Sequence, residues 1–168
     1  MTYSTNSRHI TRFMARIDFH SHVSDKLQYC CRLSRKIMAS ADPQAQPRTI
    51  VITGNSKELK ELDALMWTFS KTDFLPHAWL DDESAHETPI LFVTNTDDLT
   101  GRAHLHQDIL IYLHTEPPKS LDQLLQRFPR WIEVVTTQDD ELKAGRERFK
   151  AYRSMGHELH HFDQSKTV

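Results

Sequence analysis

The sequence predicts an α/β sandwich built on a largely parallel central sheet. Short continuous apolar runs at residues 49–52, 90–93, 109–113 and 131–135 have the length and composition of strands that are covered on both faces. Segments with helical apolar spacing lie between several of these runs, and strands that alternate with helices favour a parallel sheet. The length of the chain predicts a single domain, 1–168, that can bury a sizeable core.

The first elements are a polar lead-in, a strand and a helix. Residues 1–12 are polar, and residues 16–19 are predicted to form the first strand. From Val23 the spacing becomes helical, and Ser21 or Ser24 could supply the N-cap. The inward face of this helix would carry Val23, Leu27, Cys30, Cys31, Ser34, Ile37 and Met38. Because the two cysteines are adjacent, a disulfide between them is not expected, and because they lie on or beside the buried stripe we interpret them as small core residues rather than as reactive thiols.

A second helix is predicted after the strand at 49–52. Residues 41–47 form a proline-containing loop before that strand, and Gly54 lies in the turn after it. The apolar stripe of this helix consists of Leu59, Leu62, Leu65, Met66 and Phe69. Trp67 falls roughly 100–140° away from the stripe on a helical wheel, so it is either covered by another element or left for a partner.

The second half of the chain adds strands and a short helix. Residues 74–77 are predicted to be a short extended segment, 81–88 an acidic loop, and 94–101 a turn-rich break. Strands follow at 90–93, 109–113 and 131–135 as described above. Ser120 is expected to cap a short helix. The inward residues of that helix are Leu121, Leu124, Leu125 and Phe128.

A helix over residues 137–156 has marked ends and two different faces. Thr137 is the expected N-cap, acidic residues occupy the first turn, and Gly156 is placed for a left-handed C-terminal residue. The core side would carry Ala144, Ala151, Tyr152 and Met155. The other side is a basic stripe made of Leu142, Lys143, Arg146, Phe149, Lys150 and Arg153. The polar tail at 157–168 is predicted to be extended or frayed.

The basic stripe by itself is compatible with three interpretations. It could be a solvated cationic face, a surface for an acidic peptide with an apolar end, or a site where Phe149 stacks on a base of single-stranded nucleic acid. The formal net charge of −2 argues against a protein that binds polyanions over its whole surface.

Motifs for catalysis, cofactors or metals are not recognised. The four glycines form neither a G-x-G-x-x-G nor a Walker pattern, and no G-x-S-x-G elbow is present. The eleven histidines include two H-x-H pairs and a C-terminal cluster, but no third ligand follows at a recognisable spacing. We therefore expect no catalytic residue, no cofactor and no metal. The sequence also lacks a membrane span and the apolar core of a signal peptide, which favours a cytoplasmic location.

Three segments resemble one known family. Residues 146–159, RERFKAYRSMGHEL, resemble the C-terminal signature of the chi subunit of bacterial DNA polymerase III. Residues 62–67 (LDALMW) followed by 74–77 (FLPH) resemble that family's L-D-x-x-L-W…F-[VL]-P-H segment, with the same spacing from Trp to Phe. A third match is the DILI sequence at 108–111. The matches occur in one order along most of the chain up to Gly156.

The resemblance implies a three-layer α/β/α Rossmann-like sandwich and a non-enzymatic adaptor of the DNA-directed DNA polymerase holoenzyme. Members of the family pair with the psi subunit in the clamp-loader complex. They also bind the acidic, phenylalanine-terminated C-terminal tail of single-stranded DNA-binding protein, so that contact with DNA is indirect. The matching positions for the tail are Val135, Leu142, Lys143, Arg146, Phe149, Lys150 and Arg153. Trp67 and Phe74 match positions that contact psi or a helicase.

The chain departs from the family pattern at the start of the stripe. Leu142 stands where a lysine is expected, and Lys143 is the neighbouring residue, so either could serve. Phe149 occupies a tyrosine-like position, which keeps the ring and loses the hydroxyl. A direct single-stranded nucleic-acid binder and, less favoured, a small nucleotide-binding enzyme are the alternatives to the adaptor.

Overall fold

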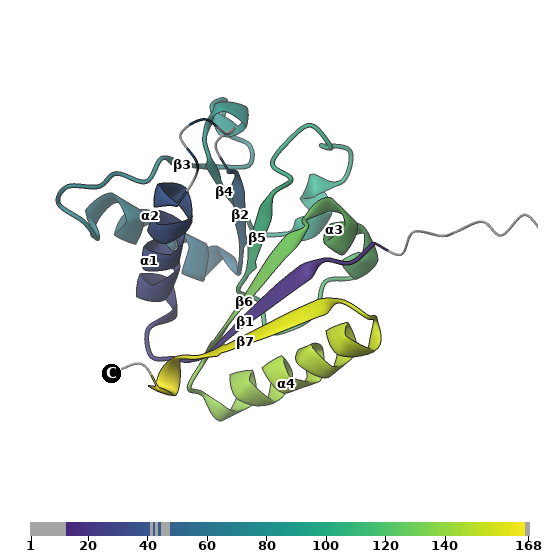
Figure 1. Cartoon of the computed structure of the whole chain (residues 1–168). Helices are drawn as coiled ribbons and strands as arrows, with labels where there is room; N and C mark the ends of the chain where they lie inside the picture. The colour runs from purple at the N-terminus through teal and green to yellow at the C-terminus, as the bar shows by residue number, and fades with distance from the viewer. Residues whose placement is uncertain (1–12, 41, 43, 45–47, 167–168) are drawn as a thin grey trace, which may run out of the picture.

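The computed structural model describes residues 13–40, 42, 44 and 48–166 (Figure 1). The predicted lead-in at 1–12 and most of the loop at 41–47 lie outside the described residues. The strands are β1 (Arg16–Val23), β2 (Ile50–Thr53), β3 (His77–Trp79), β4 (Ile90–Val93), β5 (Ile109–Tyr112), β6 (Arg130–Thr136) and β7 (Glu158–Asp163). The helices are α1 (Lys26–Ala39), α2 (Ser56–Thr68), α3 (Leu121–Arg127) and α4 (Asp139–Ser154), with short 3-10 turns η1 (Ala85–Glu87), η2 (Thr96–Leu99) and η3 (Gln164–Lys166).

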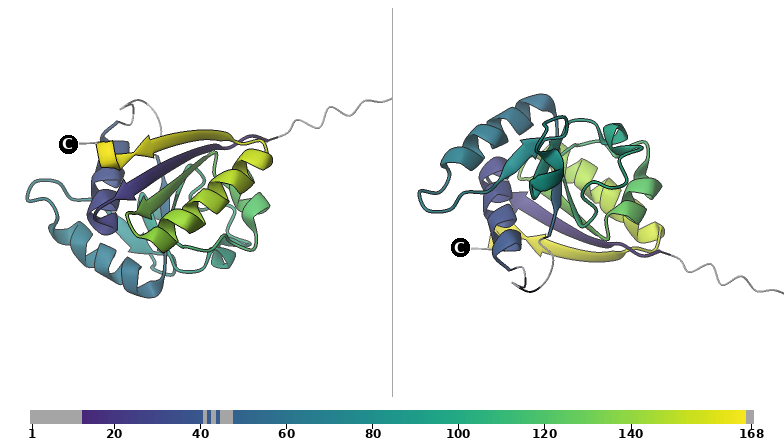
Figure 2. Two further views of the ribbon diagram at one scale, coloured as in Figure 1. Left: turned by 90° about the horizontal axis from the view of Figure 1, so that it is seen from below. Right: turned by 90° about the horizontal axis from the view of Figure 1, so that it is seen from above.

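The strands form one seven-stranded sheet in the order β3-β4-β2-β5-β6-β1-β7, and every neighbouring pair is parallel. Helices α1 and α2 cover one face, and α3 and α4 cover the other (Figures 1 and 2). Each face has its own apolar core, because alternate residues of the central strands point to opposite sides. The three-layer α/β sandwich predicted from the sequence is thus confirmed.

The first strand is longer than predicted, and this changes the start of the first helix. β1 continues through Val23, because it lies between β6 and β7 and pairs with both. α1 therefore begins at Lys26, and the prediction of Ser21 or Ser24 as its cap is wrong. Asp25 is the N-cap, and its side chain accepts a hydrogen bond from the Gln28 amide at 3.0 Å.

The two cysteines of α1 are free and buried against the sheet, as predicted for core residues. Burial raises the pKa of the Cys31 thiol to about 11, and it raises that of Cys30 further. Both thiols are therefore protonated and unreactive near neutral pH. Among the described residues, no helix is long and apolar enough to cross a lipid bilayer.

The tail is extended, as predicted, but it is not frayed over residues 158–163. This segment is the edge strand β7, which pairs with β1 so that His161 lies opposite Phe19. Leu159 packs against the core, while most of the other β7 side chains are partly or fully exposed. The strand has no apolar run because an edge strand needs only backbone pairing and a few inward contacts.

Candidate functional site

Helix α4 begins one residue later than predicted and lacks a side-chain cap. Gln138 is the N-cap residue, so the prediction of Thr137 is wrong by one position. Two backbone amides just before the helix are instead bonded by nearby side chains. Glu141 Oε2 accepts from the Thr136 amide at 3.0 Å, and Thr136 Oγ1 accepts from the Gln138 amide at 3.3 Å. Gly156 has φ of 83°, which confirms the predicted left-handed C-terminal residue.

The inward face of α4 also differs from the prediction. Its buried residues are Gly145, Arg148 and Tyr152, whereas Ala151 is exposed. Of the predicted core side, Ala144 and Met155 are only partly buried, and Tyr152 is fully buried. The rotation of α4 about its own axis places Arg148 and Tyr152 inward, because both side chains bond a buried carboxylate on β6.

That carboxylate belongs to Glu133, which is fully buried. Arg148 donates to Glu133 Oε2 from Nε at 3.1 Å and from Nη2 at 2.9 Å. Glu133 Oε1 accepts from the Tyr152 hydroxyl at 2.7 Å and from Trp131 Nε1 at 3.1 Å. Burial, together with the charge of Glu133, raises the pKa of Tyr152 far above its usual value. Because both carboxylate oxygens are occupied by donors, this cluster holds α4 against the sheet and does not resemble a catalytic site.

A groove of about 320 Å³ runs between α4 and the strands β1, β6 and β7. All predicted tail-binding residues except Lys143 line it: Val135, Leu142, Arg146, Phe149, Lys150 and Arg153. Lys143 is exposed and lies outside the lining, so Leu142 rather than Lys143 occupies the groove. We call this feature the α4 groove. Its remaining lining residues, which the sequence did not single out, are Phe19, Ser21, His22, Gly145 and His161.

The floor of the α4 groove is apolar. The Phe149 ring packs edge-on against Phe19, with centroids 5.1 Å apart, and is therefore partly buried rather than projecting from the helix. Val135 lies under Gly145 of the helix, and a Cβ at Gly145 would be only 3.1 Å from Val135 Cγ2. Glycine at this position therefore allows α4 to approach β6 closely.

The rim of the α4 groove is cationic. Arg146, Lys150 and Arg153 are exposed on the solvent side of the helix. The guanidinium of Arg153 lies 5.8 Å from the centre of the Phe149 ring. Lys150 Nζ is 3.9 Å from Glu147 Oε1, but both side chains are largely exposed. Arg146 and Arg153 form no ion pair with any of the described residues. These charges are therefore available to an anionic ligand.

A second feature lies on the opposite face of the sheet, where α2 packs. Trp67 and Phe74 are 61% and 55% exposed, and their ring centroids are 4.9 Å apart. We call this pair the aromatic patch. Trp67 is thus not covered by another element of the described chain, which leaves it accessible to a partner.

Asp63 holds Trp67 of the aromatic patch and the neighbouring side chains His77 and Trp79. Its Oδ1 accepts from Trp67 Nε1 at 3.2 Å and bonds His77 Nε2 at 2.9 Å, while Oδ2 accepts from Trp79 Nε1 at 2.9 Å. Partial burial acts to raise the pKa of Asp63, but these hydrogen bonds together hold it below its usual value. Asp63 and His77 both belong to the LDALMW…FLPH segment, but the sequence did not indicate that they contact and orient Trp67.

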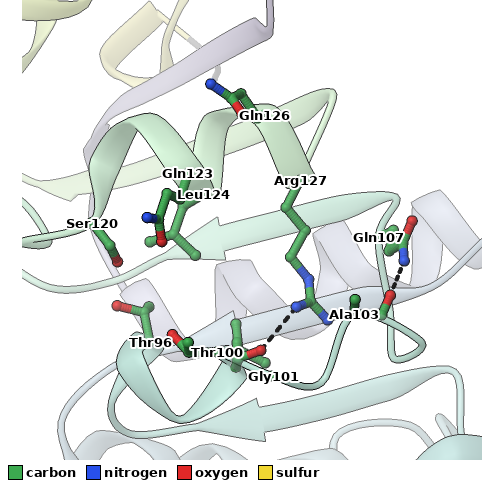
Figure 3. Close-up of a pocket in the computed structure, with 11 residues that line it drawn as sticks. Thr96, Thr100, Gly101, Ala103, Gln107, Ser120, Gln123, Leu124, Gln126 and Arg127 are labelled. Atoms are coloured by element: carbon green, nitrogen blue, oxygen red, sulfur yellow. Dashed lines mark hydrogen bonds between the residues drawn. The ribbon is translucent and has the colours of Figure 1, made fainter.

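Another hollow, of about 400 Å³, lies between α3 and the segment after η2 (Figure 3). Its one charged lining residue is Arg127, which points into the loop below α3. The Arg127 guanidinium donates to the carbonyls of Leu99, Arg102, Leu105 and His106 at 2.8–3.2 Å. This arginine therefore fixes the loop, and the other lining side chains are mainly amides, hydroxyls and small apolar groups. The described residues contain no group of three or more His, Cys, Asp or Glu side chains arranged to hold a metal ion.

Comparison with known proteins identifies one family. The model of the family described as "DNA polymerase III chi subunit, HolC" matches residues 14–160, which is most of the chain. The matched region includes the aromatic patch and every lining residue of the α4 groove except His161. A search of curated proteins found no match to the chain.

Proposed function

The chain belongs to the DNA polymerase III chi subunit family, and from this we propose that it is an adaptor within the replicative polymerase. Family membership supports an accessory role in DNA replication. The finer proposal has two parts. The α4 groove binds the acidic C-terminal tail of single-stranded DNA-binding protein, and the aromatic patch binds the psi subunit or a helicase. We place this assembly in the cytoplasm and assign the chain no catalysis of its own.

The observation that carries the first part is the combination of an apolar floor and a cationic rim in one groove. Phe149 and Val135 form a floor for an aromatic side chain, and Arg146, Lys150 and Arg153 stand where carboxylates of the same peptide can reach them. The volume of about 320 Å³ is at the small end of ligand pockets, which suits one side chain and its flanking residues.

The two parts of the groove contribute to binding in different ways. Exposed charge pairs contribute about 0.2–1 kcal/mol each and weaken as salt is added. Burial of an aromatic ring is less sensitive to salt and contributes more per residue. We expect the cations to raise the association rate and the terminal aromatic to slow dissociation.

The second part of the proposal rests on the exposure of the aromatic patch. Two large rings are in contact with each other, and one of them, Trp67, is hydrogen-bonded to Asp63; such a pair has the composition of a binding hot spot. Because the patch and the α4 groove lie on opposite faces of the sheet, one molecule can bind both partners at once.

The alternative of direct single-stranded nucleic-acid binding needs a free ring face on Phe149. That ring packs edge-on against Phe19 and has the Arg153 guanidinium over it, so base stacking would require both to move. We therefore favour the peptide, and a titration with a bare oligonucleotide distinguishes the two.

Calorimetry with a short acidic peptide that ends in phenylalanine tests the proposal. We expect binding that weakens at least about tenfold when the terminal Phe is removed, because the apolar floor loses its ligand. Arg146→Ala and Lys150→Ala should each weaken binding by about two- to fivefold without changing stability. Lys143→Ala is the matched control, since Lys143 is on the same helix but outside the groove.

Unchanged affinity in both groove variants would refute the assignment of the α4 groove. Tighter binding of a bare oligonucleotide than of the peptide, with a steep dependence on salt, would favour the nucleic-acid alternative.

A further inference from the structure

The wall of the α4 groove opposite the cationic rim carries two histidines that the family resemblance did not assign. His22 is at the end of β1 and His161 is in the middle of β7, and both line the groove. Ser21 joins them: its Oγ is 2.7 Å from His161 Nε2 and 3.1 Å from His22 Nδ1. His22 Nδ1 is also 3.0 Å from Asp163 Oδ1.

The backbone places both histidines at this wall. The β1–β6 pairing shifts register between His20 and Val23, and within this bulge His22 has φ of 56°. A bulge of this kind redirects a side chain away from the regular alternation of the strand. His161 lies opposite Phe19 in the β1–β7 pairing, which puts it beside the floor of the groove, 6.3 Å from the Phe149 ring centre.

Protonation would change what this wall can bind. A neutral imidazole has one N–H donor and a protonated imidazole has two. His161 Nδ1 and His22 Nε2 make no hydrogen bond to the described residues, so after protonation each can donate to a ligand. The bonds to Ser21 can remain, because the serine oxygen accepts.

The charged groups near the two histidines belong to α4, β7 and η3. Arg146, Lys150 and Arg153 of α4 are cations on the same groove, and Lys166 of η3 lies near the carboxylate of Asp163. Asp163 of β7 is the carboxylate in contact with His22, and it is itself held by Ser165. A ligand carboxylate would therefore compete with one partly exposed aspartate and would face the α4 cations across the groove.

We propose that His22 and His161 form a second anion subsite of the α4 groove, which binds a carboxylate of the acidic peptide when the imidazoles are protonated. This inference rests on the proposed function, since the peptide is the ligand of the same groove. According to this inference, residues of the sheet, and not only those of α4, determine the affinity and selectivity of the groove for the peptide. Peptides with carboxylates near the terminal aromatic can reach both walls, while a peptide with a single charge can reach only one.

The subsite should make the affinity of the chain for the acidic peptide higher in weakly acidic than in weakly alkaline solution. Histidine is the side chain that changes charge between weakly alkaline and weakly acidic solution, whereas the carboxylates of the peptide remain ionised down to about pH 4. We expect the acidic peptide to bind roughly fivefold more tightly at about pH 6 than at about pH 8. A peptide with the aspartates replaced by asparagine and an amidated end should show no such change.

The experiment measures peptide affinity by calorimetry at the two pH values for the wild-type chain and for His22→Asn/His161→Gln. Asparagine is used at position 22 because it tolerates a left-handed backbone. His86→Gln is the matched control, since His86 is 63% exposed in η1 and far from the groove lining. Circular dichroism at each pH checks that every variant is folded.

Loss of the pH dependence in the double variant, but not in His86→Gln, would support the subsite. An equal pH dependence in the double variant and the wild type, or none in the wild type, would overturn it while leaving the peptide groove in place. Absence of peptide binding by the wild type at both pH values would overturn the proposed function and the subsite with it.

Discussion

Arg148 and Glu133 form a buried ion pair that joins α4 to strand β6 of the sheet, with Arg148 Nη2 2.9 Å from Glu133 Oε2. Arg148 also donates to the Thr115 carbonyl, and Glu133 accepts from Tyr152 and Trp131 as well. The pair therefore fixes the rotation of α4, and with it the residues that face the α4 groove.

Removal of Arg148 should be strongly destabilising. Arg148→Met would leave the Glu133 carboxylate buried beside two neutral donors, and loss of one partner of a buried pair typically costs about 3–5 kcal/mol. Urea unfolding followed by circular dichroism measures this change. Arg148→Met/Glu133→Gln should cost less than the sum of the single changes, because no charge is then left unpaired. A loss below about 1 kcal/mol in Arg148→Met would show that the pair does not hold the helix.

Gly145 should resist the substitution that usually stabilises a helix. Gly145→Ala normally gains about 1 kcal/mol of helix propensity, but the new Cβ would lie 3.1 and 3.3 Å from the two methyl groups of Val135. We expect no gain, or a loss of stability, in the wild-type background. In a Val135→Ala background the same change should stabilise by about 1 kcal/mol. Equal effects in the two backgrounds would contradict the contact.

The aromatic patch should be required for one partner and dispensable for the other. Trp67→Ala or Phe74→Ala should abolish co-purification with a co-expressed psi subunit and leave acidic-peptide affinity unchanged, because the patch is on the other face of the sheet. Phe13→Ala is the control, since Phe13 is 44% exposed outside the patch. Asp63→Asn should give an intermediate loss, as it weakens the contacts that orient Trp67. Wild-type recovery of psi with both alanine variants would refute this assignment.

His20 should make stability depend on pH. Burial lowers its pKa to about 4, whereas an unfolded histidine titrates near 6.5. The unfolded chain therefore binds a proton at this residue before the folded chain does, and the free energy of unfolding falls as pH is lowered from about 6.5 to about 4. The loss from His20 is at most about 3 kcal/mol.

The contribution of His20 is measured by unfolding at several pH values. His20→Gln should lose about 2 kcal/mol less than the wild type between about pH 7 and pH 4.5, whereas the exposed His86→Gln should follow the wild type. Parallel curves for His20→Gln and the wild type would show that another group controls this range.

Local patterns in the sequence are sufficient for much of this fold. The apolar runs predict β2, β4, β5 and β6, and helical spacing predicts all four helices. These elements bury a continuous stripe or a whole strand, and burial of that kind leaves a periodic signal in the residues themselves. The basic side of α4 is predicted for the same reason, since one helix presents all of it.

The groove walls could not be predicted in this way, because they depend on pairing between distant segments. His161 and His22 reach one site only through the β1–β7 register, and β7 is polar enough to be interpreted as a tail. Glu133 and Arg148 look like solvated charges when each segment is considered alone, and they are buried only because each neutralises the other. Local spacing thus specifies which face of an element is buried. Long-range pairing and the neutralisation of buried charge decide which elements meet and which side chains form the groove.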